Sequence, residues 1–117
     1  MERPLSEKYK NRIRPINIEG VIGFAWEREL LIAFLKDKES DYYAILGGDV
    51  FILVNGQMEY TYDNWGVESR SPRESFDSYV KRCKEITLKY IDSYPISKNI
   101  LFGPVMTSEP TAGLLSQ

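Results

Sequence analysis

Carboxylates, lysines and tyrosines are the side chains of this sequence that could carry out acid–base chemistry. The 117 residues include no histidine and a single cysteine, Cys83. Histidine is the commonest general base near neutral pH and the commonest metal ligand, so its absence excludes Ser-His-Asp, Cys-His and HExxH sites and nearly all zinc chemistry. One cysteine forms neither an intramolecular disulfide nor a cysteine metal cage. We therefore expect no metal, no cofactor and no catalytic residue.

A β-hairpin is predicted around Asn55-Gly56, the strongest short-range signal for a two-residue type I′ turn. Its strands would be Asp49 to Val54 and Gln57 to Tyr62. The register then places three pairs on one face, which we expect to be the core side. These pairs are Leu53 with Met58, Phe51 with Tyr60, and Asp49 with Tyr62.

Asp49 and Asp63 are the carboxylate pair that we tested for general acid and base roles. In the predicted hairpin, Asp63 lies opposite Gly48 and points to the other face from Asp49. Glycosidase chemistry needs two carboxyls roughly 5 to 9 Å apart across one cleft. The register gives no such arrangement, so an enzyme with a pocket lined by Asp49, Tyr62 or Asp63 is the alternative rather than the expectation.

Gly47-Gly48-Asp49 has some likeness to a glycine-rich phosphate loop. Neither a lysine nor a helix start follows it, and the next residues favour a strand. We interpret the segment as a bend or bulge that joins two strands, with Asp49 bonded to the local backbone.

Two segments have helical spacing of apolar residues. The first runs from Ala25 to Lys38. The second begins at Ser71-Pro72-Arg73-Glu74, which has a serine N-cap, a proline at the first helical position and a capping-box glutamate, and it stops at Pro95. Cys83 lies on the apolar stripe of the second helix, where a thiol is a small core residue far more often than a nucleophile.

Apolar runs at residues 42–48 and 99–106 predict further strands, and residues 16–24 could add an early one. Pro104 favours a sheet edge or a bulge. The elements together indicate one α+β domain, a small, mainly antiparallel sheet with two packed helices. We expect three parts: residues 1–15 as a basic N-terminal arm or short helix, 16–106 as the α+β domain, and 107–117 as a C-terminal tail, with loose order of the terminus as the simpler reading of the arm.

No secretory signal or membrane span is predicted. The first residues mix charges without an apolar segment, and the longest apolar run, Leu30 to Leu35, is far shorter than the roughly 18 residues that a span requires. We therefore expect a cytoplasmic protein.

Charge is distributed unevenly along the chain. No basic residue occurs between Lys38 and Arg70, and six acids fall in that interval. A net charge of −2 and an acidic sheet region disfavour nucleic acid but suit a basic protein surface and steered association. The six acids are Glu39, Asp41, Asp49, Glu59, Asp63 and Glu68.

Tyrosine and tryptophan in the same interval are typical of interface hot spots. Trp65 could instead fill the core where the hairpin leaves the sheet, which is the commoner fate of a large aromatic residue. We predict a binding surface of acidic and aromatic side chains: Asp49, Glu59, Tyr62, Asp63, Trp65 and Glu68.

Four segments resemble immunity protein family 40 of bacterial polymorphic toxin systems, which include contact-dependent growth inhibition. They are Ala25-Trp26, Ala44-Ile45-Leu46-Gly47-Gly48-Asp49-Val50, Asp63-Asn64-Trp65, and the Glu74 to Tyr79 helix start with Tyr90-Ile91 near its end. The resemblance covers roughly residues 24–106. It implies a small α+β protein, encoded beside a toxin, that neutralises this toxin by direct binding, and it implies no catalytic residues.

The residues and the resemblance agree on a protein that binds another protein. The expected partner is a cognate toxin domain, for example a basic nuclease, with no nucleic acid or membrane involved and the oligomeric state left open. Two alternatives are a small enzyme that uses carboxylate and tyrosine chemistry, and an adaptor subunit of a larger assembly.

Overall fold

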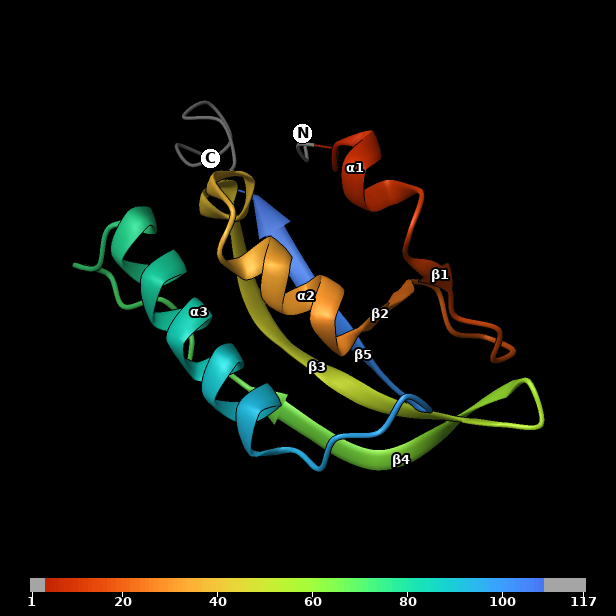
Figure 1. Ribbon diagram of the computed structural model, residues 1–117. Helices are drawn as coiled ribbons and strands as arrows, with labels where there is room; N and C mark the ends of the chain where they lie inside the picture. The colour runs from red at the N-terminus through yellow and green to blue at the C-terminus, as the bar shows by residue number, and fades with distance from the viewer. Residues whose placement is uncertain (1–3, 109–117) are drawn as a thin grey trace.

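Five strands form one antiparallel sheet in the order β1-β2-β5-β3-β4 (Figure 1). The structure, a computed structural model, describes residues 4–108. The α+β fold with an antiparallel sheet is confirmed. Along the chain the elements are α1 (Glu7–Lys10), β1 (Arg14–Pro15), β2 (Phe24–Glu27), α2 (Arg28–Leu35), the 3-10 helix η1 (Lys38–Tyr42), β3 (Tyr43–Val54), β4 (Gln57–Gly66), α3 (Phe76–Ser93) and β5 (Ile100–Ser108).

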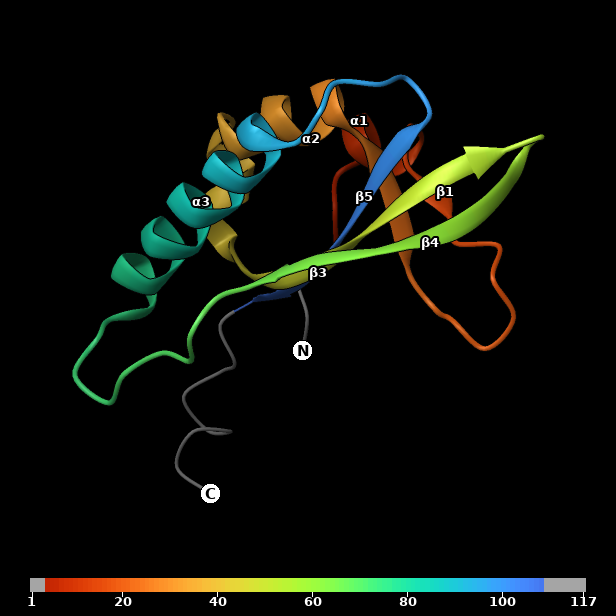
Figure 2. The same cartoon turned by 90° about the horizontal axis from the view of Figure 1, so that it is seen from below.

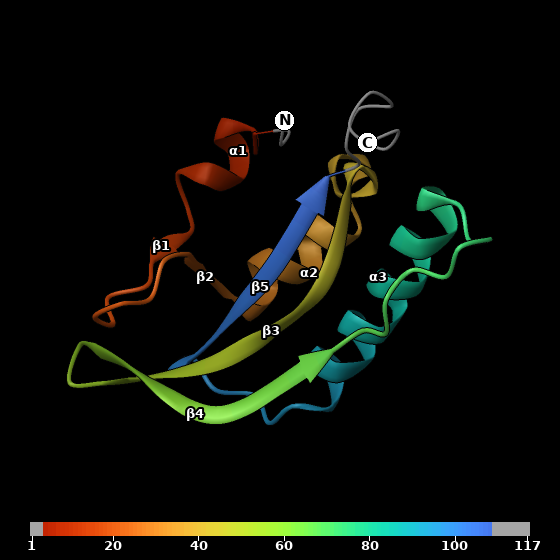
Figure 3. The same cartoon turned by 180° about the vertical axis from the view of Figure 1, so that it is seen from behind.

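Helices α2 and α3 pack on the same face of the sheet (Figure 2). We call the opposite side of β3, β4 and β5 the open face, and Figure 3 shows it with α2 behind the strands. The β1–β2 loop covers one end of this side, where Ile16 and Ile18 pack on Phe51 and Leu101. The rest carries no helix from the described chain, and its side chains are Leu46, Asp49, Tyr60, Tyr62, Asn64 and Val105.

The main core lies between the sheet and the helices. Trp26 of β2 and Phe34 of α2 pack with ring centroids 5.1 Å apart, and Tyr9 of α1 contacts both rings. The predicted apolar stripe of the second helix is confirmed, since α3 buries one residue every three or four positions. The buried residues of α3 are Phe76, Tyr79, Val80, Cys83, Thr87 and Ile91.

The first predicted helix, Ala25 to Lys38, was too long. Ala25 and Trp26 belong to β2, and Trp26 pairs with Phe102 of β5. Glu27 is extended, with φ −68° and ψ 149°, so the helix begins only at Arg28. The helical spacing of Trp26 is therefore coincidental, because its burial comes from strand pairing with a distant segment.

The second helix begins at Phe76 rather than at Ser71-Pro72. The Ser75 hydroxyl caps it by accepting a hydrogen bond from the Ser78 N–H at 3.1 Å. The capping-box bond from the Ser71 N–H to the Glu74 carboxylate exists at 3.2 Å, but it closes a turn before the helix. The predicted end before Pro95 is confirmed, since α3 ends at Ser93.

The two glycines of Gly47-Gly48 lie inside one strand and do not end it. β3 runs without interruption from Tyr43 to Val54, and its register with β5 shifts between Ile45 and Gly47. The predicted bulge is thus present, although the predicted break into two strands is wrong. The predicted bond from Asp49 to the local backbone is also wrong, since its side chain forms no hydrogen bond within residues 4–108. Gly47 has φ 144°, a conformation that non-glycine residues rarely adopt.

The hairpin has the predicted turn and the predicted register near it. Asn55 and Gly56 have φ 50° and 79°, as a type I′ turn requires. Leu53 lies opposite Met58 and Phe51 opposite Tyr60. The predicted face is core only at this end of the hairpin, because Phe51 and Met58 form a small separate cluster with Ala25 and Leu101.

Beyond this point the predicted register is wrong by two residues. Asp49 lies opposite Asn64, not Tyr62, and Gly48 lies opposite Trp65, not Asp63. On β3 only Val50 separates the two paired positions, whereas on β4 residues 61–63 do. β4 thus has two residues more than β3 at this point. Because side chains alternate with a period of two, each residue keeps its predicted face of the sheet, but its partner on the other strand changes.

Thr61 stabilises this wide bulge with its side chain. Its hydroxyl donates to the Val50 carbonyl at 2.9 Å and accepts from the Asp63 N–H at 3.0 Å. The next residue, Tyr62, has φ 71°. The hydroxyl therefore replaces a backbone bond that the bulge removes from the ladder.

The described chain differs at both ends from a loosely ordered arm and a tail that begins at residue 107. Residues 7–10 form the short helix α1, and Tyr9 is buried, so this part of the arm is packed. The early strand predicted at 16–24 is wrong, since residues 16–23 form the loop between β1 and β2. β5 continues to Ser108, and the rest of the predicted tail lies outside the described residues.

Pro104 lies at a local edge, as predicted. β2 pairs with β5 only at Leu101 and Phe102, so on the β2 side the strand is unpaired at Pro104. In the part of the chain that the structure describes, no helix is long and apolar enough to cross a membrane.

Candidate protein-binding surface

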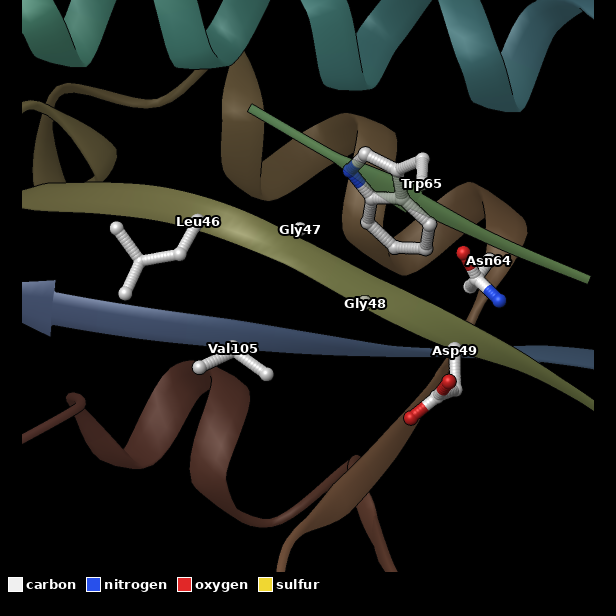
Figure 4. A pocket seen from close by; sticks show the side chains of 7 residues that line it. All are labelled: Leu46, Gly47, Gly48, Asp49, Asn64, Trp65 and Val105. Carbon is white, nitrogen blue, oxygen red and sulfur yellow. The ribbon is translucent and has the colours of Figure 1, made fainter. Parts of the chain in front are cut away.

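A hollow of about 330 Å³ opens on the open face (Figure 4). Leu46 of β3 and Val105 of β5 lie at one end, and Asp49 and Asn64 lie at the other. The two apolar side chains are 37% and 54% exposed, which is unusual for large residues in central strands. We call this feature the Asp49 hollow; its lining residues are Leu46, Gly47, Gly48, Asp49, Asn64, Trp65 and Val105.

Gly48 is required by the packing of Trp65. A Cβ atom at this position would lie 2.5 Å from Cη2 of Trp65 and 2.6 Å from the Gly103 carbonyl oxygen. Only glycine lets the indole ring cross β3 at this distance. The glycine pair is therefore a packing feature within a strand, which agrees with the rejection of a phosphate loop.

Trp65 fills the core, as the alternative interpretation held. It is 8% exposed, and its Nε1–H donates to the Thr87 hydroxyl of α3 at 3.0 Å. Its ring also stacks on Tyr90, with centroids 5.1 Å apart. Of the six predicted contact residues, Trp65 therefore has the least surface to offer a partner.

Tyr62 is the most exposed aromatic side chain of the open face, at 84%. Its ring stacks on Tyr60 with centroids 6.0 Å apart, and Tyr60 in turn contacts Phe51 at 5.1 Å. The positive φ of 71° is uncommon for a bulky residue and costs of order 1–3 kcal/mol. The fold thus holds a large aromatic ring in solvent at a strained position.

Asp63 lies on the helix side of β4. The Tyr94 hydroxyl, at the end of α3, donates to its Oδ2 at 2.7 Å. Burial, and then this bond to the carboxylate, raise the pKa of Tyr94. Asp49 lines the hollow on the other side, so the two carboxylates do not converge.

Glu59 and Glu68 lie apart from the hollow. Glu59 is exposed on β4 opposite Ile52, near the hairpin turn. Glu68 is exposed in the loop after β4, and its backbone carbonyl accepts from the Arg82 guanidinium at 3.1 Å. Of the six predicted residues, the structure thus brings only Asp49 and Tyr62 to the open face.

Leu46, Asn64 and Val105 are the surface residues that the sequence did not reveal. Leu46 and Val105 lie in apolar runs that predict buried strands, and nothing local distinguishes them from core residues. Asn64 lies on the open face opposite Asp49, and the two-residue surplus of β4 produces this pairing. Its neighbours Asp63 and Trp65 are on the helix side, and this alternation was the available signal.

The acidic interval is divided between partners inside the molecule and the surface. Glu39 accepts from the Ser6 N–H at 2.8 Å and from its hydroxyl at 2.6 Å, and Asp41 accepts from Lys84 at 2.6 Å. By contrast, β3, β4 and β5 contain no lysine or arginine at all. Their carboxylates are Asp49, Glu59 and Asp63.

The two most perturbed carboxylates are structural. The Tyr9 hydroxyl and the Lys8 ammonium bind Asp37 and lower its pKa to about 2, which fixes α1 to the start of η1. The Arg82 guanidinium binds both oxygens of Glu74 and lowers its pKa to about 2. Both groups are held as ions in pairs, unlike a general acid.

Other site chemistry finds no support in residues 4–108. No group of three or more histidine, cysteine, aspartate or glutamate side chains is placed to hold a metal ion there. Cys83 is fully buried, and burial raises the pKa of its thiol. A buried thiol of raised pKa is unreactive, in agreement with the core role expected for it.

Comparison with known proteins identifies the family. The model of the family described as Immunity protein 40 matches residues 13–106, from just before β1 to near the end of β5. No curated protein matches the chain. No solved structure matches it either. The family match covers most of the chain, including α2, α3 and nearly the whole sheet, and it confirms the expected resemblance: the chain belongs to the Immunity protein 40 family.

Proposed function

We propose that this protein neutralises a cognate toxin by binding directly to it through the open face. Membership of an immunity protein family supports a toxin-neutralising role. The setting we propose is a polymorphic toxin system of the contact-dependent inhibition type, with the protein acting in the cytoplasm of the cell that it protects.

The proposal that the open face is the binding surface rests on one observation: this face carries no helix and exposes the ring of Tyr62. Tyr62 is 84% exposed and strained, and Leu46 and Val105 add exposed apolar area on the same face. Strained residues persist where they serve a function, and tyrosine is enriched among hot spots. A partner that covers this side would bury all three side chains.

The charge of the three strands supports a basic partner. β3, β4 and β5 carry carboxylates and no cation, so a positively charged protein would be attracted and correctly oriented during encounter. A toxin that acts on nucleic acid needs a basic surface for its own substrate. A nuclease toxin is therefore the partner class that fits best.

The enzyme alternative has weaker support. It requires Asp49, Tyr62 or Asp63 to share a pocket, but Asp63 binds Tyr94 on the helix side and Tyr62 projects into solvent. An adaptor role is equally compatible with a binding face, and it predicts a neighbouring gene for an assembly component in place of a toxin.

Co-expression with the toxin domain encoded beside the gene tests the proposal. We expect the pair to co-purify and the host cells to survive, whereas the toxin alone arrests growth. The matched control is a toxin of another family, against which the protein should give no protection. Absence of both a complex and protection with the neighbouring toxin would refute the proposal.

A further inference from the structure

We propose that the Asp49 hollow receives a single lysine or arginine side chain of the toxin. This inference rests on the proposed function and specifies how the partner is recognised. The charged end of the side chain would lie at Asp49 and Asn64, and its aliphatic part between Leu46 and Val105 (Figure 4).

The two ends of the hollow match the two parts of such a side chain. Lysine and arginine bury their methylene groups on apolar surface while the charged head stays at a polar edge. Leu46 and Val105 supply the apolar surface and are both more than one third exposed. Asp49 and Asn64 lie at paired positions on β3 and β4 at the polar end.

The Asp49 carboxylate is available for an external cation. It is half-buried, and within residues 4–108 it forms no ion pair and no hydrogen bond. Asp41 and Glu39 differ from Asp49 in this respect. Lys84 donates a hydrogen bond to Asp41, and Ser6 donates one to Glu39. A half-buried carboxylate gains more from a charged partner than a fully solvated one.

The size of the hollow fits a side chain better than a cofactor. Its volume of about 330 Å³ is at the lower end of the range of ligand pockets, roughly 300–1,000 Å³, and one side of it is open. The glycines at 47 and 48 leave its floor as bare backbone. A projecting side chain of a flat partner surface can therefore reach the carboxylate.

Other occupants of this surface are disfavoured by charge. A second copy of the chain that docks through the same face would bring Asp49 near the same carboxylate of its partner, and the three strands offer no cation to compensate. Nucleic acid would place phosphates against the Asp49 carboxylate. A basic protein is the one macromolecule whose charge is complementary here.

The test measures binding of purified Asp49→Asn and Asp49→Lys variants to the toxin domain encoded beside the gene. We expect Asp49→Asn to raise Kd about tenfold and Asp49→Lys to raise it further, mainly through faster dissociation. Glu85→Lys is the matched control, since Glu85 is exposed on α3; its Kd should stay within about twofold of the unmodified protein. Thermal unfolding of each variant checks that it is folded.

Two outcomes would contradict the inference, and a third case concerns a variant that does not fold. A Kd for both Asp49 variants equal to that of Glu85→Lys would overturn the inference and leave the proposed function intact. Failure of the unmodified protein to bind would instead overturn the proposed function and this inference with it. If Asp49→Lys does not fold, the isosteric Asp49→Asn variant decides alone, because it removes the charge without changing the shape.

Discussion

The indole N–H of Trp65 donates a hydrogen bond of 3.0 Å to the hydroxyl of Thr87, and both side chains are buried. The bond joins β4, one of the two edge strands of the sheet, to the middle of α3. It also explains why a polar residue lies on the apolar stripe of that helix. A buried indole N–H needs a partner, and Thr87 supplies one at no cost in volume.

Replacing Thr87 with valine should lower the free energy of unfolding by about 1–3 kcal/mol, because the Trp65 N–H would be left without a partner in the core. Urea unfolding followed by tryptophan fluorescence measures the loss. Thr87→Ser keeps the hydroxyl and removes one methyl group, so it separates the hydrogen bond from packing. The explanation is wrong if serine costs as much as valine.

Gly48→Ala should be strongly destabilising, by about 1–3 kcal/mol or more, because the new methyl group would collide with Trp65 and with the Gly103 carbonyl. Gly66→Ala is the paired control. A Cβ atom at Gly66 meets nothing within 4 Å, so this variant should unfold at nearly the temperature of the unmodified protein. Equal thermal midpoints for the two variants would contradict the packing that we describe.

Acid should unfold the protein through Asp37 and Glu74. Each has a pKa of about 2 in the folded state, below its ordinary value of 3.8 or 4.5. The unfolded chain therefore binds more protons at low pH, and the stability that these carboxylates give above about pH 4.5 is lost as the pH falls towards 2.

The double variant Asp37→Asn, Glu74→Gln should accordingly have a lower thermal midpoint at neutral pH and a shallower decline from about pH 5 to 2. Differential scanning calorimetry across this range is the measurement. Glu85→Gln, at an exposed position on α3, should retain the steep decline. A double variant that declines as steeply as the unmodified protein would show that other groups control acid unfolding.

Tyr62→Asn should weaken toxin binding without weakening the fold. Asparagine tolerates a positive φ better than tyrosine does, so the thermal midpoint should be unchanged or higher. Loss of an exposed interface tyrosine should raise Kd about tenfold. An unchanged Kd would remove Tyr62 from the proposed surface. A lower thermal midpoint would contradict the strain that we assign to this position.

Glu59→Lys should slow association with a basic toxin roughly two- to fivefold at low salt and change dissociation little, because Glu59 is an exposed charge near the hairpin turn. Stopped-flow mixing at several salt concentrations measures the rate constants. The same reversal at Glu85 controls for net charge. Indistinguishable rates for the two variants would mean that the charge of the hairpin does not steer the encounter.

Local patterns were sufficient to predict the elements that depend on neighbouring residues. The Asn55-Gly56 turn fixes its own geometry, and the stripe on α3 repeats every three or four residues whatever it packs on. The α+β class follows from these two features and from the apolar runs. The end of α3 before Pro95 is local in the same sense, because proline restricts the residue that precedes it.

Features that depend on distant residues could not be predicted from the sequence. Trp26 has helical spacing, but it lies in a strand because it pairs with Phe102, which is far along the chain. The surplus of β4 depends on the Thr61 hydroxyl replacing a backbone bond to Val50. The candidate site depends on this surplus, which carries Asn64 to a position opposite Asp49.

The open face carries residues that the fold does not need, whereas the residues directly behind it are needed for packing. Leu46, Tyr62 and Val105 contribute little to the buried core, so exchanging them costs the fold little stability. Trp65 and Gly48 behind them are fixed by mutual packing. The side chains of this surface, and with them the partner, can therefore change while the packing that defines the fold stays the same.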